Sequence, residues 1–204
     1  MPTELGLFPL NIVLLPGERV PLHIFEERYK ALIAECLEQS TSFGLVHAGE
    51  AGLAPIGTTA AVTEVLNRYE DGRLDIVVEG RDRFRVGTLT EGRSWLTAEV
   101  EPVPDVASDP QPEVVEQCVE AYRTLADLAG AEPGELDLES STLSYAIAGR
   151  IEFEAELKQE LLELTDEPGR LERLTELLIE AGDTLERRDV ILRRALGNGR
   201  VDHL

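Results

Sequence analysis

The chain has 204 residues, enough for one large domain or two small ones, and 43% of them are hydrophobic, which suffices for a buried core. Its formal net charge is −21 at pH 7. A field of that sign repels phosphate backbones and anionic lipid headgroups, so the composition disfavours nucleic acid and membrane surfaces as partners.

The acidic charge differs between the two halves of the chain. Residues 1–100 carry a net charge of −6 and residues 101–204 carry −15. Acidic residues spread along the chain, rather than run together, are typical of a solvated surface. The difference in net charge predicts that the two halves differ in structure. The cysteines, Cys36 and Cys118, form no CxxC pair and fall in apolar registers of predicted helices, which predicts buried free thiols and a reducing cytoplasm.

The most apolar stretch, LGLFPLNIVLLPGERVPLHIF, is interrupted by three prolines and spans residues 5–25. Its apolar run at 12–15 is far shorter than the ~20 residues of a membrane helix, and no basic residue precedes it. We therefore expect neither a signal peptide nor a membrane span. Proline is tolerated at strand edges, which predicts short extended pieces with a turn at Pro16–Gly17.

A helix followed by short strands is predicted next. Apolar residues recur at three-to-four spacing over 24–39, which predicts an amphipathic helix ending near Gln39. The later segments are short, apolar or β-branched, and Asp71–Gly72 marks a tight hairpin between two of them. The predicted strands lie at 43–49, 57–69, 73–80, 83–92 and 94–105. Five or more strands at hairpin spacing indicate a small closed or half-closed β-barrel.

The pattern changes after a proline-rich linker at 102–112. A helical stripe follows over 115–129, then a loop at 131–141 with a helix start at Ser140 or Ser141. Two further helical pieces are predicted at 143–151 and 153–164.

A long last helix is predicted from Pro168 to a stop at Gly197-Asn198-Gly199. One face carries these apolar residues: Leu171, Leu174, Leu178, Ala181, Leu185, Leu192 and Ala195. At 1.5 Å per residue such a helix is roughly 40 Å long, more than its short neighbours can cover. Its stripe is either bundle core or, in part, an interface such as that of a homodimer.

No motif of known catalytic chemistry occurs in the sequence. It has no phosphate-binding P-loop, no dinucleotide fingerprint and no nucleophile elbow. The histidines, His23, His47 and His203, are isolated from metal-ligand spacing, and the two lysines, Lys30 and Lys158, fall on polar helix faces. We therefore predict no catalytic residue, no metal site and no cofactor.

Several of these segments, taken in order, resemble the N-terminal substrate-binding domain of the bacterial Lon protease, the LON domain. The block P-L-H-I-F-E-x-R-Y, with the later G-x-x-R-F, is the most specific part, and the resemblance covers about residues 5–195. The N-terminal matches are Leu7 to Leu10, Leu15 to Gly17, Pro21 to Glu26 with Arg28 and Tyr29, Gly57 and Thr58, Asp71 to Arg73, and Gly80 with Arg83 to Arg85. The C-terminal matches are Leu157 to Glu163 and Arg170 to Leu174.

The resemblance implies an α+β fold: a PUA-like β-barrel with one early helix, at 1–104, followed by a helical bundle, at 105–204, ending in a long helix. Full Lon carries an ATPase module and a Ser-Lys protease module after this domain, and this chain ends at Leu204 before either could begin. We therefore expect a stand-alone LON-domain protein that is not an enzyme. In full Lon this domain helps to recognise unfolded or tagged substrates.

Two groups of residues are candidates for a surface role. In PLHIFEERY, we predict a binding site at Phe25, Arg28 and Tyr29. The structural alternative is that Phe25 and Tyr29 pack against the barrel while Glu26 and Arg28 hydrogen-bond, with His23 as a satisfied histidine beside the core.

The second group is a set of alternating arginines, Arg81, Arg83 and Arg85, which share one side of an extended strand. They form either a basic stripe for an acidic segment or ion pairs with Asp75, Glu79 or Asp82.

The leading functional hypothesis is a non-catalytic module that binds unfolded or extended protein segments, as an adaptor or regulator linked to proteolysis. One alternative is a scaffolding protein that binds one folded partner through its C-terminal helices. A hydrolase without recognisable motifs is a third reading. An RNA-binding PUA-like module is the most remote, because a strongly acidic chain with a lone tryptophan offers little of the surface that RNA needs.

Overall fold

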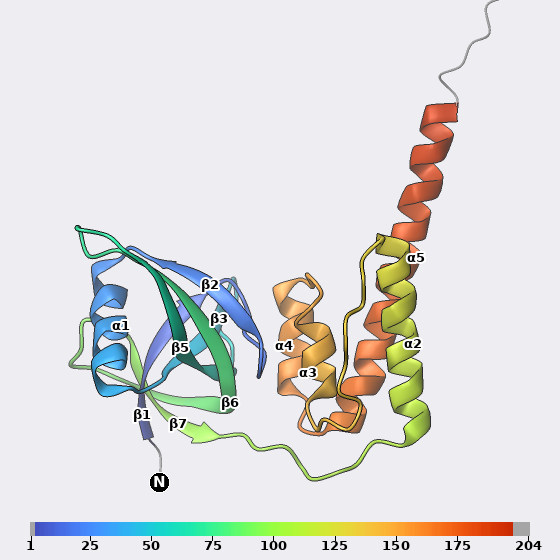
Figure 1. The fold of residues 1–204 in the computed structure, drawn as a ribbon. Helices are drawn as coiled ribbons and strands as arrows, with labels where there is room; N and C mark the ends of the chain where they lie inside the picture. The colour runs from blue at the N-terminus through green and yellow to red at the C-terminus, as the bar shows by residue number, and fades with distance from the viewer. Residues whose placement is uncertain (1–2, 198–204) are drawn as a thin grey trace, which may run out of the picture. The chain divides into compact units, whose positions relative to one another are not determined.

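The structure is a computed structural model that describes the backbone of residues 3–197 and the side chains up to Arg188. Its contacts divide the chain into two compact units (Figure 1). The first unit contains the chain up to Ala107 together with Tyr145–Asp166, and the second contains Ser108–Ser144 and the chain from Glu167 onward. The predicted mixed α+β class is confirmed. No helix of the described part is long and apolar enough to span a membrane.

The first unit is built on a seven-stranded sheet. Its strands are β1 (Thr3–Leu10), β2 (Arg19–Ile24), β3 (Phe43–Gly49), β4 (Gly52–Leu53), β5 (Ile56–Arg68), β6 (Leu74–Thr90) and β7 (Thr97–Pro102). They follow the order β1-β7-β6-β5-β3-β4, and β1 also pairs with β3 in parallel. The pairing thus returns to the first strand, so that β1, β7, β6, β5 and β3 form a closed circuit. β2 pairs with β6 outside this circuit.

Two turns predicted from the sequence are confirmed. The hairpin between β5 and β6 turns at Asp71–Gly72, where Gly72 has a φ of +83°. In the Pro16–Gly17 turn, the Glu18 amide donates to the Leu15 carbonyl at 3.0 Å. β6 passes so close to this turn that a Cβ on Gly80 would lie 2.2 Å from the Leu15 carbonyl oxygen. Glycine is therefore required at position 80.

The predicted early helix is α1 (Glu27–Gln39). It begins after extended residue Glu26 and ends at Ser40, whose left-handed φ of 53° stops the helix. Its buried stripe, Tyr29, Leu32, Ile33 and Cys36, packs into the larger core of the sheet unit. The prediction started the helix three residues too early, because Ile24 belongs to β2 and Phe25 follows it.

A helix from the second half of the sequence also belongs to the sheet unit. This is α4 (Ala155–Glu163), in which Lys158 Nζ lies 2.5 Å from Glu18 Oε1 and the Gln159 side-chain amide donates to the Ile56 carbonyl at 3.1 Å. The sequence-based boundary near residue 104 had placed this helix with the C-terminal half. Residues 145–166 instead make their contacts with the sheet unit.

The predicted basic stripe at Arg81, Arg83 and Arg85 is wrong because Arg83 is only 5% exposed. Its guanidinium donates to the carbonyls of Leu162, at 2.8 Å, and Leu164, at 2.5 Å, and to the carboxylate of Asp105. The Arg83 guanidinium therefore binds both the end of α4 and the start of the linker. Arg81 is exposed and pairs with Glu79 at 3.0 Å, as one of the alternatives predicted.

The second unit contains the long helices α2 (Pro112–Ala129) and α5 (Glu167–Gly197), which lie side by side (Figure 1). α3 (Leu143–Ala148) crosses the division between the units. Leu171, Leu174 and Leu178 of the predicted α5 stripe are buried. The side chains of Leu192 and Ala195 lie outside the described part, as do His203 and the predicted stop at Asn198 and Gly199.

A buried polar cluster fixes the first turn of α5. The Glu167 carboxylate accepts hydrogen bonds from the Ser144 amide and hydroxyl, both at 2.7 Å, and from the Arg170 guanidinium at 2.8 Å. Cys118 and Cys36 are buried free thiols, as predicted. Burial raises the pKa of Cys118 to about 11, so this thiol is neutral and unreactive at pH 7.

Candidate functional site

An exposed aromatic cluster lies where β2, β5 and β6 run side by side. Antiparallel pairing places Asp75 of β6 opposite His23 of β2 and opposite Asn67 of β5. Residues directly opposite one another project to the same face of a sheet. The flanking residues Ile76 and Leu74 are buried, so the face that carries Asp75 is the outer one.

Asp75 holds this face together as a hydrogen-bond acceptor. Its Oδ1 lies 2.5 Å from His23 Nδ1, while its Oδ2 accepts from Asn67 Nδ2 at 2.9 Å and from the Tyr69 hydroxyl at 2.7 Å. These bonds, that of His23 foremost, lower the pKa of Asp75 to about 2. The hydrogen bond from the Tyr69 hydroxyl to Asp75 raises the pKa of the Tyr69 phenol, because the carboxylate holds the hydroxyl proton.

The rings around this carboxylate form one surface, which we call the aromatic patch: His23, Phe25 and Tyr69. The His23 ring stacks beside Phe25 with centroids 6.0 Å apart and meets the edge of Tyr69 at 6.1 Å. Phe25 is 61% exposed, a large value for a phenylalanine. An apolar surface of this kind is suited to contact with another protein.

Neighbouring ion pairs fix the hairpin beside the patch. Lys30 of α1 donates to the Asp71 carbonyl at 2.9 Å and to Glu27 at 2.8 Å, which ties the helix to the hairpin. Arg73 donates to the Asp71 carboxylate at 2.7 Å and lies over the Tyr69 ring at 4.9 Å. These bonds therefore hold in place the hairpin that lies beside the aromatic patch.

The structure separates the three predicted site residues. Phe25 is exposed, so the alternative that it packs against the barrel is wrong. Arg28 is half exposed, donates to Glu26 at 2.9 Å, as predicted, and lies 4.4 Å over the Tyr29 ring. Tyr29 is 4% exposed and stacks on Phe8 at 3.9 Å, and burial raises the pKa of its phenol.

Sequence reasoning missed Tyr69 and Asp75 as members of this surface. His23 has a partner in Asp75, as predicted, but it lies on the exposed face and not beside the core. A signal was present in RLDIVVEG, where Asp75 lies between apolar residues at an alternating position, as an outward-facing residue does in a half-buried strand. Its distance from His23 in sequence, 52 residues, concealed the pairing.

The His23–Asp75 pair lies among aromatic side chains. A His–Asp pair is also part of hydrolase triads, but there the second ring nitrogen faces a nucleophile. Around His23 the ring neighbours are Phe25 and Tyr69. Within the described residues, no group of three or more His, Cys, Asp or Glu side chains is arranged to hold a metal ion.

Known proteins resemble this chain over most of its length. Residues 4–180 match the family model of the ATP-dependent protease La (LON) substrate-binding domain. Lon protease 2 of Myxococcus xanthus is 30% identical over 196 residues, covering 87% of this chain. Lon protease 2 of Syntrophobacter fumaroxidans is 25% identical over 203 residues, covering 91%. The chain spans about a quarter of the length of these curated relatives, 24% and 25%.

Two solved structures share the fold. The Lon N-terminal domain protein from Xanthomonas campestris matches with a TM-score of 0.68 and 28% identity, over 84% of this chain and 96% of that one. The N-terminal domain of Mycobacterium avium complex Lon protease matches with a TM-score of 0.67 and 23% identity, over 89% and 98%. With its family model matched over residues 4–180, this chain belongs to the family of LON substrate-binding domains.

Proposed function

We propose that this protein is a non-catalytic module that binds unfolded or extended segments of other proteins, and that the aromatic patch makes the contact. The observation that carries the proposal is the exposure of Phe25, at 61%, on a supported surface of a chain from a substrate-binding family. Phe25 and Arg28 are the accessible members of the predicted site. Tyr29 supports Arg28 from below, through the contact of its ring with the guanidinium.

An apolar side chain of a client gains most by covering Phe25 and Tyr69. Aromatic residues at the centre of an interface commonly cost about 2 kcal/mol or more when truncated. The network around Asp75 holds Tyr69 in place before binding, so little conformational entropy is lost at the moment of contact. Because the rings offer shape and apolar area without a charge requirement, the surface tolerates many client sequences.

The test is fluorescence anisotropy of a labelled, permanently unfolded model protein titrated with the purified chain, with the folded form of the same protein as control. Phe25→Ala is compared with Leu89→Ala, which truncates another large exposed apolar residue of the sheet unit, near the far end of β6. We expect saturable binding to the unfolded form and a loss of about tenfold or more for Phe25→Ala only.

Equal losses in the two variants would assign the binding to general stickiness and overturn the role of the patch. No binding by the unaltered chain at tens of micromolar would overturn the recognition of unfolded segments altogether.

Within this proposal the module serves proteolysis as an adaptor or regulator, since the family is named for a protease domain that binds substrates. Free buried cysteines support a cytoplasmic site of action. The closed circuit of five strands supports a PUA-like barrel as the fold of the sheet unit. Light scattering after gel filtration tests the alternative of a homodimer through α5, for which the length of that helix, 31 residues, is the argument.

A further inference from the structure

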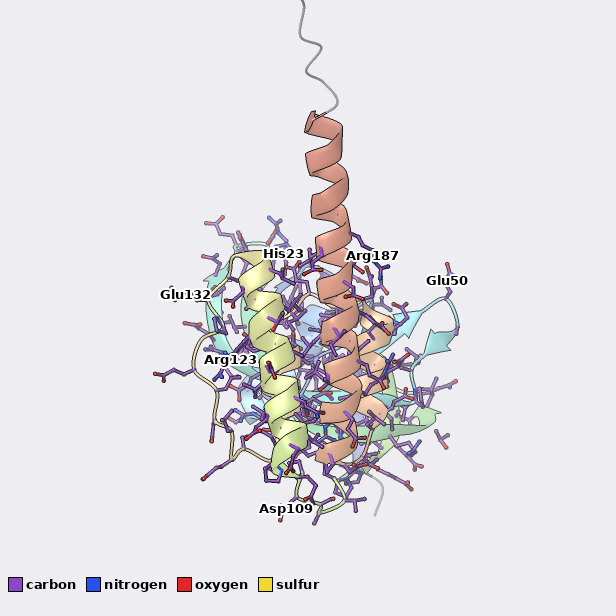
Figure 2. The ribbon with its side chains drawn as sticks, turned by 90° about the vertical axis from the view of Figure 1, so that its right-hand side faces the viewer. His23, Glu50, Asp109, Arg123, Glu132 and Arg187 are labelled. Carbon is purple, nitrogen blue, oxygen red and sulfur yellow. The ribbon has the colours of Figure 1, made fainter. Side chains whose placement is uncertain are left out.

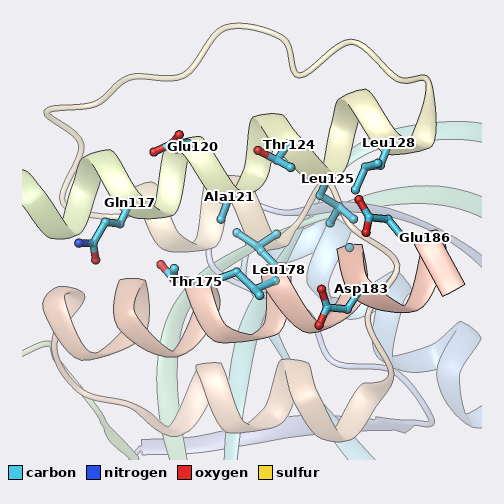
Figure 3. A pocket seen from close by; sticks show the side chains of 12 residues that line it. Gln117, Glu120, Ala121, Thr124, Leu125, Leu128, Thr175, Leu178, Asp183 and Glu186 are labelled. Carbon is cyan, nitrogen blue, oxygen red and sulfur yellow. The ribbon is translucent and has the colours of Figure 1, made fainter.

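A groove runs along the surface of the second unit, between α2 and α5 (Figure 3). Its volume is about 390 Å³. The lining residues extend from Gln117 to Leu128 on α2 and from Thr175 to Glu186 on α5. Each stretch covers about 17 Å of helix axis, which equals about three turns of a third helix laid alongside.

Small side chains on both helices open the groove, and apolar ones form its floor. Ala121 and Gly182 leave space where larger residues would close the surface; a Cβ on Gly182 would lie 3.5 Å from Leu128 Cδ1. Leu125 and Leu178 are buried below. Leu128 and Ile179 remain 41% and 54% exposed on this lining, so apolar surface is left uncovered.

The charged side chains of the described lining are all acidic. Among the described residues, the lining contains the carboxylates of Glu120, Asp183 and Glu186, and no lysine or arginine. Arg187 reaches Asp183 from the exposed side at 3.4 Å, and Arg123 lies on α2 within the lining of a different hollow (Figure 2). The groove thus combines an apolar floor with acidic edges.

We propose that this groove binds a basic amphipathic helix of a partner protein, with apolar residues at i, i+3, i+4 and i+7 on Leu128 and Ile179 and with lysines or arginines facing the three carboxylates. Two packed helices receive such a segment by laying its apolar stripe between them. Charge complementarity selects a basic occupant over a second copy of this chain, which would bring the same three carboxylates to the contact. The inference does not depend on the function proposed for the aromatic patch.

The probe is a fluorescein-labelled 18-residue helical peptide with leucines at the apolar positions and lysines elsewhere, titrated into the full chain. A second peptide keeps the leucines and replaces every lysine by glutamate. The variant Leu128→Ala/Ile179→Ala removes exposed apolar contacts. Two triple variants of equal charge change separate local from general attraction: Glu120→Gln/Asp183→Asn/Glu186→Gln in the groove, and a control with Glu113, Glu172 and Glu180 changed to Gln.

We expect saturable binding of the lysine peptide, weakened about tenfold by each groove variant and less than twofold by the control triple, with no binding of the glutamate peptide. Circular dichroism melts confirm that all variants fold. Equal weakening by the two triples would reduce the effect to attraction by a −21 chain and overturn the proposal. So would a dimer in sedimentation that the Leu128→Ala/Ile179→Ala variant dissociates, which would make a second copy the occupant.

Discussion

Replacing Arg83 by methionine tests the claim that a buried arginine joins the sheet to segments made much later in the chain. Methionine keeps the length and apolar stem of the side chain but removes every donor. The carbonyls of Leu162 and Leu164 then lose the guanidinium, and so does the carboxylate of Asp105. Loss of a buried partner costs about 1–3 kcal/mol per group.

The Asp105 side chain is one-third exposed, so water replaces part of its lost interaction. The two carbonyls therefore dominate, and we expect the free energy of unfolding to fall by about 3 kcal/mol. With a slope of about 2–3 kcal/mol per molar, the urea midpoint falls by about 1–1.5 M.

Arg81→Met is the matched control. It removes an arginine from the same strand, but one that is exposed and paired only at the surface with Glu79. Such pairs contribute about 0–1 kcal/mol, so its urea curve should lie close to that of the unaltered protein. If Arg83→Met costs no more than Arg81→Met, the guanidinium does not stabilise the end of α4, and the assignment of residues 145–166 to the sheet unit loses its main support.

Three further outcomes follow from the same structure. Phe25→Ala should change the thermal midpoint little, whereas Tyr29→Ala should cost about 3–5 kcal/mol in urea unfolding because it empties a core position; similar losses for both would place Phe25 in the core. The folded pKa of Asp75, about 2, lies below its ordinary value of 3.8, so its contribution to stability is complete above pH 4 and is lost as the pH falls toward 2. Thermal melts of Asp75→Asn should therefore lack part of the acid-induced decline, and an unchanged decline would contradict this. Gly80→Ala should destabilise strongly in the same melts, since its Cβ would meet the Leu15 carbonyl at 2.2 Å; a neutral result would contradict the close approach of β6 to that turn.

Local patterns predicted the local elements well. The α1 stripe, the hairpin at Asp71–Gly72 and the linker before Pro112 all depend on residues within a few positions of one another, and all are confirmed. Turn chemistry and helical periodicity act over such short distances.

The features that were missed depend on distant segments. Alternation in RFRV correctly indicated a strand, but it could not tell which face α4 and the linker would cover. Arg83 is buried by residues 22 to 81 positions away. The aromatic patch is of the same kind: His23 and Asp75 meet only through the pairing of β2 with β6. Periodicity reports which residues share a face and not what lies against that face.

The closed circuit of strands sets an order of events during synthesis. β1 pairs with β3 and with β7, so its second neighbour does not exist until Thr97–Pro102 has been made. At ~5–20 residues per second, the first strand of the nascent chain lacks β7 for roughly 5–20 s after its own synthesis. The Arg83 guanidinium gains its acceptors later still, once Leu162 and Leu164 have been synthesised. An unpaired strand edge is a template for association, so the edge of β1 is open to association until β7 has been made.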